Sequence, residues 1–118
     1  EREFHRTRPD AVFAANDRMA LGALMYLRTI GARVPGDIAL AGFDDTFFAE
    51  HLSPSLTTVR QPIFEMGTIA MESIIQLLQD PRPETRHIIL PAKLVVRGSC
   101  GCSDEGLHDR FPEEAVTG

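Results

Sequence analysis

The sequence predicts an α/β protein with a parallel sheet, because two apolar strands flank an amphipathic helix within about thirty residues. The run Ala11 to Ala15 is short and continuously apolar, as expected of a strand covered on both faces. Apolar residues recur at helical spacing over 18–30, and Ile38 to Phe43 is a second apolar run. Strand, helix and strand in this order form a βαβ unit, which implies parallel pairing.

The helix between the two strands has recognisable ends. Asp17 is suited to cap its N-terminus, and Gly31 is placed to end it. Its apolar face is wider than a single stripe and comprises Ala20, Leu21, Leu24, Met25 and Leu27.

The following segments are predicted to lead into a second helix. Residues 34–37 have the composition of a turn. A loop is expected over 46–54, with one helical turn at 47–49, and a short extended segment over 56–59. The second helix is predicted over 62–79, with Pro62 as its first residue.

The second helix contains a glycine, and the chain after it is predicted to be extended. Gly67 costs a helix about 1 kcal/mol relative to alanine, so it indicates close packing at that position. Residues 80–83 are predicted to end the helix, and strands are predicted at 87–90 and 94–97. From residue 98 onward the composition predicts disorder.

Size and charge exclude several classes of protein. The chain has 118 residues, enough for one domain, and a net charge of −5, which excludes an overall basic domain that coats nucleic acid. No apolar run approaches the ~20 residues that a membrane-spanning helix needs. There is no initiator methionine, and 1–6 resembles the end of a helix, so we expect the chain to be the C-terminal portion of a longer protein.

Cys100 and Cys102 are separated by one residue. Such a pair supplies at most half of a zinc site and is too close for a comfortable disulfide. We therefore expect two thiols in a loose tail.

Polar side chains follow both predicted strands. Asn16 and Asp17 follow the first strand, and Asp44 and Asp45 follow the second. Ligands of open α/β sheets bind beyond the carboxyl ends of the strands. Carboxylates and carboxamides form hydrogen bonds with hydroxyl groups and ring nitrogens. The sequence therefore predicts a cleft for a small polar molecule, held by Asn16 and Asp44.

Aromatic residues lie beside these polar groups, and several of the candidates have structural alternatives. Phe43, Phe47 and Phe48 could pack on the apolar face of a sugar or base, but Phe47 and Phe48 also suit a core or an interface. Asp17 has the alternative of a helix cap. For Asp45 the structural alternative is a loop residue whose side chain forms hydrogen bonds with its own backbone.

Catalysis is not predicted. Asp44 and Asp45 are adjacent and diverge along an extended backbone, so they are a weak acid–base pair. The four histidines have no metal-ligand spacing and no nearby nucleophile, and no glycine-rich phosphate loop is present. A phospho-accepting receiver domain would need Lys93, which has no acidic strand end beside it. We expect no enzymatic activity, no cofactor and no metal.

Several segments resemble the LacI/GalR-type transcriptional repressors. Residues 9–23 (PDAVFAANDRMALGA) and 34–45 (VPGDIALAGFDD) are similar to two motifs of that family. So are 54–62 (PSLTTVRQP), with the Met66-Gly67 pair after it, and 94–99 (LVVRGS). The motifs follow one another in order from residue 9 to residue 99, which is far more specific than any one alone.

The resemblance implies a two-lobed fold like that of type I periplasmic binding proteins, of which residues 1–99 would be the C-terminal half. Residues 1–60 and about 93–99 would lie in the C-terminal lobe, and the chain would cross between lobes near Arg60 and Gln61. Residues 62–90 would pack on the absent N-terminal lobe. Residues 100–118 would be a disordered tail.

The resemblance also implies a function. Such a protein is a cytoplasmic bacterial repressor that binds a sugar or nucleobase, forms a homodimer and contacts operator DNA through an N-terminal helix-turn-helix outside this chain. The alternative with the same fold is a periplasmic sugar-binding component of a transporter. The residues expected to bind the ligand are Asn16, Asp17, Phe43, Asp44 and Phe47. Those expected in or near the dimer interface are Leu21, Leu24, Met25 and Leu52.

Overall fold

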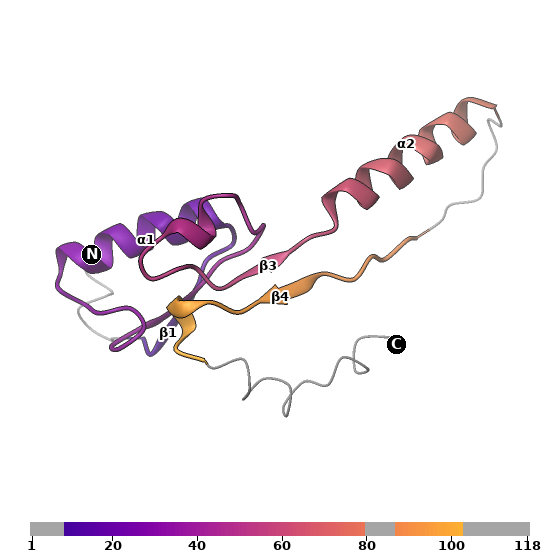
Figure 1. The fold of residues 1–118 in the computed structure, drawn as a ribbon. Coiled ribbons are helices and arrows are strands. Elements are labelled where there is room, and N and C mark those ends of the chain that lie inside the picture. Colours follow the sequence, from indigo (N-terminus) through magenta and orange to yellow (C-terminus); the bar gives the residue numbers. More distant parts are fainter. Residues whose placement is uncertain (1–8, 80–86, 103–118) are drawn as a thin grey trace. The chain divides into compact units, whose positions relative to one another are not determined.

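The computed structural model describes residues 9–79 and 87–102. The predictions for 1–6, 80–83 and 103–118 concern residues outside this description. The elements are, in order, β1 (Ala11–Phe13), α1 (Asp17–Thr29), β2 (Ala39–Ala41), the 3₁₀ turn η1 (Ala49–His51), β3 (Thr58–Arg60), α2 (Ile63–Gln79), β4 (Lys93–Val95) and the 3₁₀ turn η2 (Gly98–Cys100) (Figure 1). The chain divides into two compact units, one formed by residues up to 60 and from 93 onward, the other by 61–92.

The predicted βαβ unit is present in the first compact unit. β1 and β2 pair in parallel, with Ala11 opposite Ala39 and Phe13 opposite Ala41. A parallel bridge joins Ala41 to Thr57, so the chain entering β3 continues beside β2. β3 then pairs with β4 in antiparallel fashion. The α/β class with parallel pairing is therefore confirmed.

The core lies between α1 and one face of the strands. Ala20 and Leu24 of α1 are at most 2 % exposed and pack with Leu40 of β2 and with Leu56. β1 alternates instead of being buried throughout, since Ala11 and Phe13 are exposed. The expectation of a strand covered on both faces is wrong for the described residues, because α1 covers only one face.

The ends of α1 show one correction and one confirmation. The capping residue is Asn16, whose side-chain oxygen accepts a hydrogen bond from the backbone N–H of Met19 at 2.8 Å. Asp17, predicted as the cap, is the first residue of the helix. Gly31 follows the helix with a φ of +73°, so the predicted glycine stop is confirmed.

The C-terminal strands differ from the prediction. Residues 87–90 form no regular element, and β4 covers 93–95 where a strand was predicted over 94–97. The expected disorder from residue 98 is wrong at η2, where Ser99 is fully buried. The Ser99 hydroxyl donates to the carbonyl oxygen of Leu40 at 2.6 Å and accepts from the N–H of Thr57 at 2.8 Å. These two hydrogen bonds fix the turn to β2 and to the chain entering β3.

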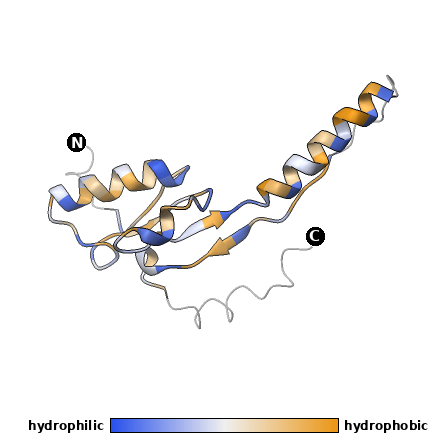
Figure 2. Cartoon of the chain, turned by 45° about the horizontal axis from the view of Figure 1, so that its top comes forward, coloured by the Kyte–Doolittle hydropathy of each residue, from blue (hydrophilic) through white to orange (hydrophobic). Residues whose placement is uncertain are grey.

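α2 has no buried residue. Apolar residues recur along the whole helix (Figure 2), and Phe64 and Leu78 are 90 % and 82 % exposed. A Cβ placed on Gly67 would meet no atom of the described chain within 4 Å, so the close packing expected there is not found among these residues. Neither helix of the described ranges has the length and apolar character needed to cross a membrane.

Candidate ligand-binding site at the carboxyl ends of β1 and β2

The two predicted polar residues lie at one edge of the sheet. Beyond the last β1–β2 pair, the N–H of Ala14 donates to the carbonyl oxygen of Ala41 at 2.9 Å. The N–H of Asp17 then donates to the carbonyl oxygen of Phe43 at 2.8 Å, so the two segments stay side by side. Asn16 directly precedes Asp17 in the chain, and Asp44 directly follows Phe43. The parallel register therefore brings Asn16 and Asp44 to the same end of the sheet.

Asn16 has one side-chain group committed and one available. Its Oδ1 caps α1 through Met19, as described above, while its amide nitrogen has no hydrogen-bond partner within 9–79 and 87–102. The side chain is half-buried. Asn16 can therefore donate a hydrogen bond to a ligand while it holds the helix terminus.

Asp44 has an unusual backbone conformation. Its φ is +104° and that of Asp45 is +51°, a region that favours glycine. Such conformations cost on the order of 1–3 kcal/mol each and concentrate at functional sites. The N–H of Asp44 donates to the carbonyl oxygen of Val59 at 2.9 Å, which ties this turn to β3. The half-buried Asp44 is thus held at the strand end at an energetic cost.

Asp45 is committed to two arginines. Its carboxylate lies 2.5 Å from Nε of Arg60 and 2.7 Å from Nη2 of Arg97, and its side chain is only 5 % exposed. Burial alone would raise the pKa of Asp45, but the hydrogen bonds and positive charges of the two arginines outweigh burial and leave this pKa below its usual value. Asp45 therefore anchors the loop after β2 to β3 and to the chain after β4, rather than to its own backbone.

Asp17 lies beneath the site rather than on its surface. The side chain is fully buried. Its Oδ2 accepts hydrogen bonds from the N–H and the hydroxyl of Thr46 at 2.7 and 3.0 Å, and its Oδ1 accepts one from the hydroxyl of Thr58 at 2.6 Å. A Cβ on Gly42 would lie 2.4 Å from Oδ1, so the backbone must pass close to this carboxylate. Direct contact with a ligand, as predicted for Asp17, would need an exposed atom that the residue does not have here.

Sequence reasoning missed the residues that hold these carboxylates. Thr46 and Thr58 hold Asp17, while Arg60 and Arg97 hold Asp45. The only available signal was the choice of residue types: hydroxyl donors and arginines at strand ends can satisfy a carboxylate. Nothing in the spacing indicates which carboxylate each one serves.

The aromatic candidates differ in exposure. Phe43 and Phe48 are half-buried, whereas Phe47 is 86 % exposed. The rings of Phe47 and Phe48 meet edge to face, with centroids 5.7 Å apart. Phe47 and Phe48 precede η1, so the helical turn predicted at 47–49 lies two residues later, at Ala49–His51. The exposed ring of Phe47 is therefore accessible to a ligand, whereas the half-buried ring of Phe43 is less accessible.

The residues predicted for the dimer interface also differ in exposure. Leu24 is 2 % exposed and packs inside the core, so it is not available to a partner. Leu21 is half-buried, and Leu52 packs against the core while remaining half-buried. Met25 is 59 % exposed. The accessible part of the predicted interface therefore consists of Leu21, Met25 and Leu52.

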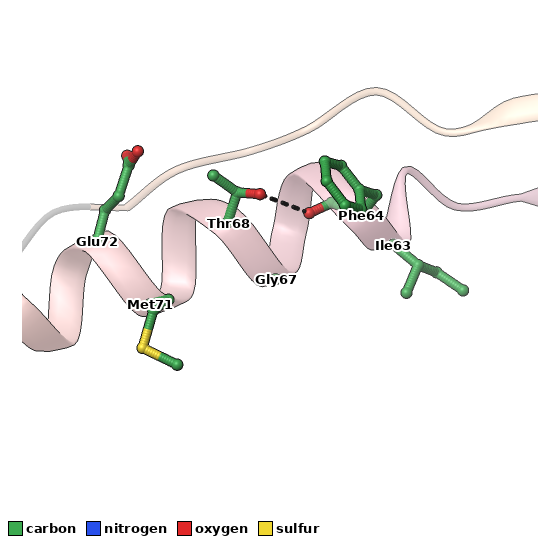
Figure 3. A pocket seen from close by; sticks show the side chains of 6 residues that line it. All are labelled: Ile63, Phe64, Gly67, Thr68, Met71 and Glu72. Atoms are coloured by element: carbon green, nitrogen blue, oxygen red, sulfur yellow. Dashed lines mark hydrogen bonds between the residues drawn. The ribbon is translucent and has the colours of Figure 1, made fainter.

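A hollow of about 540 Å³ lies in the second compact unit, away from the predicted residues. Figure 3 shows the side chains that line it. All six belong to α2, and the hydroxyl of Thr68 donates to the carbonyl oxygen of Phe64 within that helix. The lining residues are Ile63, Phe64, Gly67, Thr68, Met71 and Glu72. A single helix supplies only one wall of this hollow, and none of the residues predicted to bind a ligand lines it.

Comparison with known proteins identifies the family. The periplasmic binding protein-like domain matches residues 1–100. The lactose operon repressor of Rhizobium radiobacter is 38 % identical over 92 residues, which are 78 % of this chain and 80 % of that relative. The chain belongs to the LacI family of transcriptional regulators. The resemblance and the predicted fold, like that of the periplasmic binding proteins, are thereby confirmed.

Other LacI-family members match only over part of their length. The ribose operon repressor of Haemophilus influenzae is 38 % identical over 93 residues, which are 79 % of this chain and 28 % of that protein. The solved complex of the transcriptional regulator CelR with cellobiose is 42 % identical with a TM-score of 0.72, covering 76 % of this chain and 28 % of that one. The chain spans about a quarter of the length of such curated relatives, which are transcriptional regulators rather than enzymes.

Proposed function

We propose that this LacI-family chain is the effector-sensing and dimerising part of a DNA-binding repressor. The observation that carries the proposal is the meeting of Asn16 and Asp44 at one end of the parallel β1–β2 pair. A carboxamide and a carboxylate in this position suit a small polyhydroxylated molecule. The relatives named for ribose and lactose operons, and the regulator solved with cellobiose, favour a sugar and favour a repressor over a transporter component.

Each proposed contact has a distinct chemical part. The Asn16 amide donates to a sugar hydroxyl, and the Asp44 carboxylate accepts from one or two others. Phe47, with its exposed ring, and Phe43 pack on the apolar face of the sugar. Asp17 supports the site from beneath through Thr46 and Thr58. A nucleobase, the alternative ligand, would bind the Asn16 amide and the Asp44 carboxylate through its ring nitrogens.

The proposed mechanism needs the complete protein. Residues 1–60 and about 93–99 form part of the C-terminal lobe, and 62–90 pack on an N-terminal lobe outside this chain. The sugar favours one arrangement of the two lobes, and lobe closure changes the spacing of two DNA-binding heads in the dimer. The sugar can change operator affinity only by its differential affinity for the two arrangements. In this proposal the protein acts in the bacterial cytoplasm as a regulator, like its relatives, rather than as an enzyme, and works without a cofactor.

The test of the ligand site is Asp44→Asn in the complete repressor. Calorimetry with ribose, lactose, cellobiose and adenosine identifies the compound that binds the unchanged protein. We expect Asp44→Asn to weaken its binding at least about tenfold, because a charge-assisted hydrogen bond contributes roughly 1.5–3 kcal/mol. Operator binding without ligand is expected to stay unchanged.

Asp10→Asn is the matched control, because Asp10 is an exposed carboxylate just before β1. We expect this variant to bind the sugar normally. Equal affinity of Asp44→Asn and the unchanged protein would remove Asp44 from the site.

The test of the dimer surface is Leu21→Asp, which buries an unpaired charge if Leu21 meets a partner subunit. We expect sedimentation to find monomers for this variant. Thr29→Asp places the same charge on an exposed position of the same helix and is expected to leave the dimer intact. A dimer that persists in Leu21→Asp contradicts the proposed interface.

A further inference from the structure

The last described residues form a tight turn around a Cys-Gly-Cys sequence. Gly101 has a φ of +70°, a left-handed conformation that favours glycine. A Cβ on Gly101 would lie 3.3 Å from Cβ of Pro35, so the turn rests closely on the segment before β2. On its other side, Ser99 is buried and bonded to the sheet, as described above. The turn is therefore fixed from both sides.

This turn directs Cys102 back towards Cys100. The N–H of Cys102 donates to Sγ of Cys100 at 3.2 Å, and Sγ of Cys102 donates to the carbonyl oxygen of Cys100 at 3.8 Å. Cys100 is half-buried and Cys102 is exposed. The two thiols are thus near each other, and small molecules can reach them.

Hydrogen bonding favours the thiolate form of Cys100. Burial alone would raise the pKa of this thiol. The polar surroundings outweigh burial and leave the pKa lower than usual: the side chain of Thr57 and the residue Cys102, whose backbone N–H donates to Sγ of Cys100, both stabilise the thiolate. The thiolate is the nucleophile in thiol–disulfide exchange, so Cys100 is the better attacking group.

We propose that Cys100 and Cys102 are a redox-active dithiol, which a small-molecule disulfide oxidises to an intramolecular Cys100–Cys102 disulfide. The Cys100 thiolate attacks one sulfur of the small disulfide, forms a mixed disulfide and releases a thiolate. Cys102 then loses its proton to water, attacks Sγ of Cys100 and releases the second thiolate. The two cysteines lose two electrons and two protons, and the small disulfide is reduced to two thiols.

The short spacing makes this disulfide reversible. A ring with a single residue between the cysteines departs from relaxed disulfide geometry, and strained disulfides are the easily reduced, regulatory ones. A zinc ion is a weaker alternative occupant. Within 9–79 and 87–102 no group of three or more histidine, cysteine or acidic side chains is placed to hold a metal, whereas zinc sites use at least three protein ligands.

The experiment treats the reduced full chain with oxidised glutathione and then labels the remaining thiols with N-ethylmaleimide. We expect mass spectrometry to find a product with no label and no glutathione, lighter than the reduced chain by two hydrogens. Dithiothreitol is expected to restore both labelling sites. A peptide map should place the link between Cys100 and Cys102 of one chain.

Two single variants test the roles of the thiols. Cys102→Ser should stop at the mixed disulfide, with one glutathione on Cys100. Cys100→Ser should take up glutathione several-fold more slowly, because the better nucleophile is absent. The proposal is overturned if the unchanged chain retains glutathione on both cysteines, links two chains together, or fails to react. Equal rates in the two variants would overturn the assignment of Cys100 as the attacking thiol. None of these results depends on the proposed sugar site.

Discussion

α1 and α2 both carry apolar faces, but their surroundings are opposite. Ala20, Leu24 and Leu27 of α1 are at most 2 % exposed, whereas no residue of α2 is buried. α2 is at least as apolar as α1 (Figure 2). The comparison shows that an apolar pattern predicts the helix, while burial depends on a partner surface that the pattern does not contain.

The partner of α1 is close to it in the chain. α1 lies between β1 and β2 in one βαβ unit, so its apolar stripe meets Leu40 of β2, and Leu56 from the segment before β3 completes this core. For α2 the described residues supply no covering surface. An apolar helix without a layer to pack on contributes little to stability, so we expect this chain alone to be marginally stable.

The largest difference between the helices should come from leucine truncation. Leu24→Ala is expected to lower the free energy of unfolding by about 2–5 kcal/mol, because it leaves a cavity in the core. Leu78→Ala, at an exposed position of α2, should change it by no more than about 0.5 kcal/mol. Urea unfolding measures both values. If both substitutions lowered the free energy of unfolding equally, α2 would be covered in solution, and the contrast between the two helices would be wrong.

A smaller effect is expected at the ion pairs that fix the first unit. The folded pKa of Asp45 is lowered, so its ionised form contributes stability that is complete above its unfolded pKa of about 3.9. That contribution is lost as the pH falls through the lower folded pKa. Asp45→Asn should therefore lower stability at pH 7 by on the order of 1 kcal/mol, allowing for the exposure of Arg60.

The measurement for Asp45 is urea unfolding at a series of pH values from 7 down to 3. The difference between Asp45→Asn and the unchanged chain should shrink at the acidic end of the series. Asp10→Asn serves as the control and should show little difference throughout. A difference for Asp45→Asn that is independent of pH would contradict the charge-based explanation.

The smallest effect is expected at a glycine of α2. Gly67→Ala should stabilise the chain by about 0.5–1 kcal/mol, because the helix is favoured and the added methyl meets no described atom. Gly42→Ala should instead destabilise it by roughly 1–3 kcal/mol, since its methyl would collide with Asp17. Thermal unfolding compares the two variants. Destabilisation by Gly67→Ala would indicate that a partner surface lies against α2.

The sequence predicted the placement of Asn16 and Asp44 because strand ends in a parallel pair must meet at one edge. It did not predict the partners of Asp17, Asp45 and Ser99. The bonds of Asp17 to Thr46 and Thr58 span 29 and 41 residues, and that of Ser99 to Leu40 spans 59. No local pattern encodes such distant partners. From the sequence alone, the buried side chains of Asp17, Asp45 and Ser99 could not be distinguished from exposed carboxylates and hydroxyls.

The amino-acid order by itself determined the βαβ unit, the glycine that ends α1 and the family, since each depends on residues near one another along the chain. Only the tertiary structure decided that Asp17 is buried, that Asp45 joins two arginines and that Ser99 fixes the last turn. The physical reason is that a buried polar group must find its partner in space. That partner is chosen by how the strands come together rather than by its distance along the sequence.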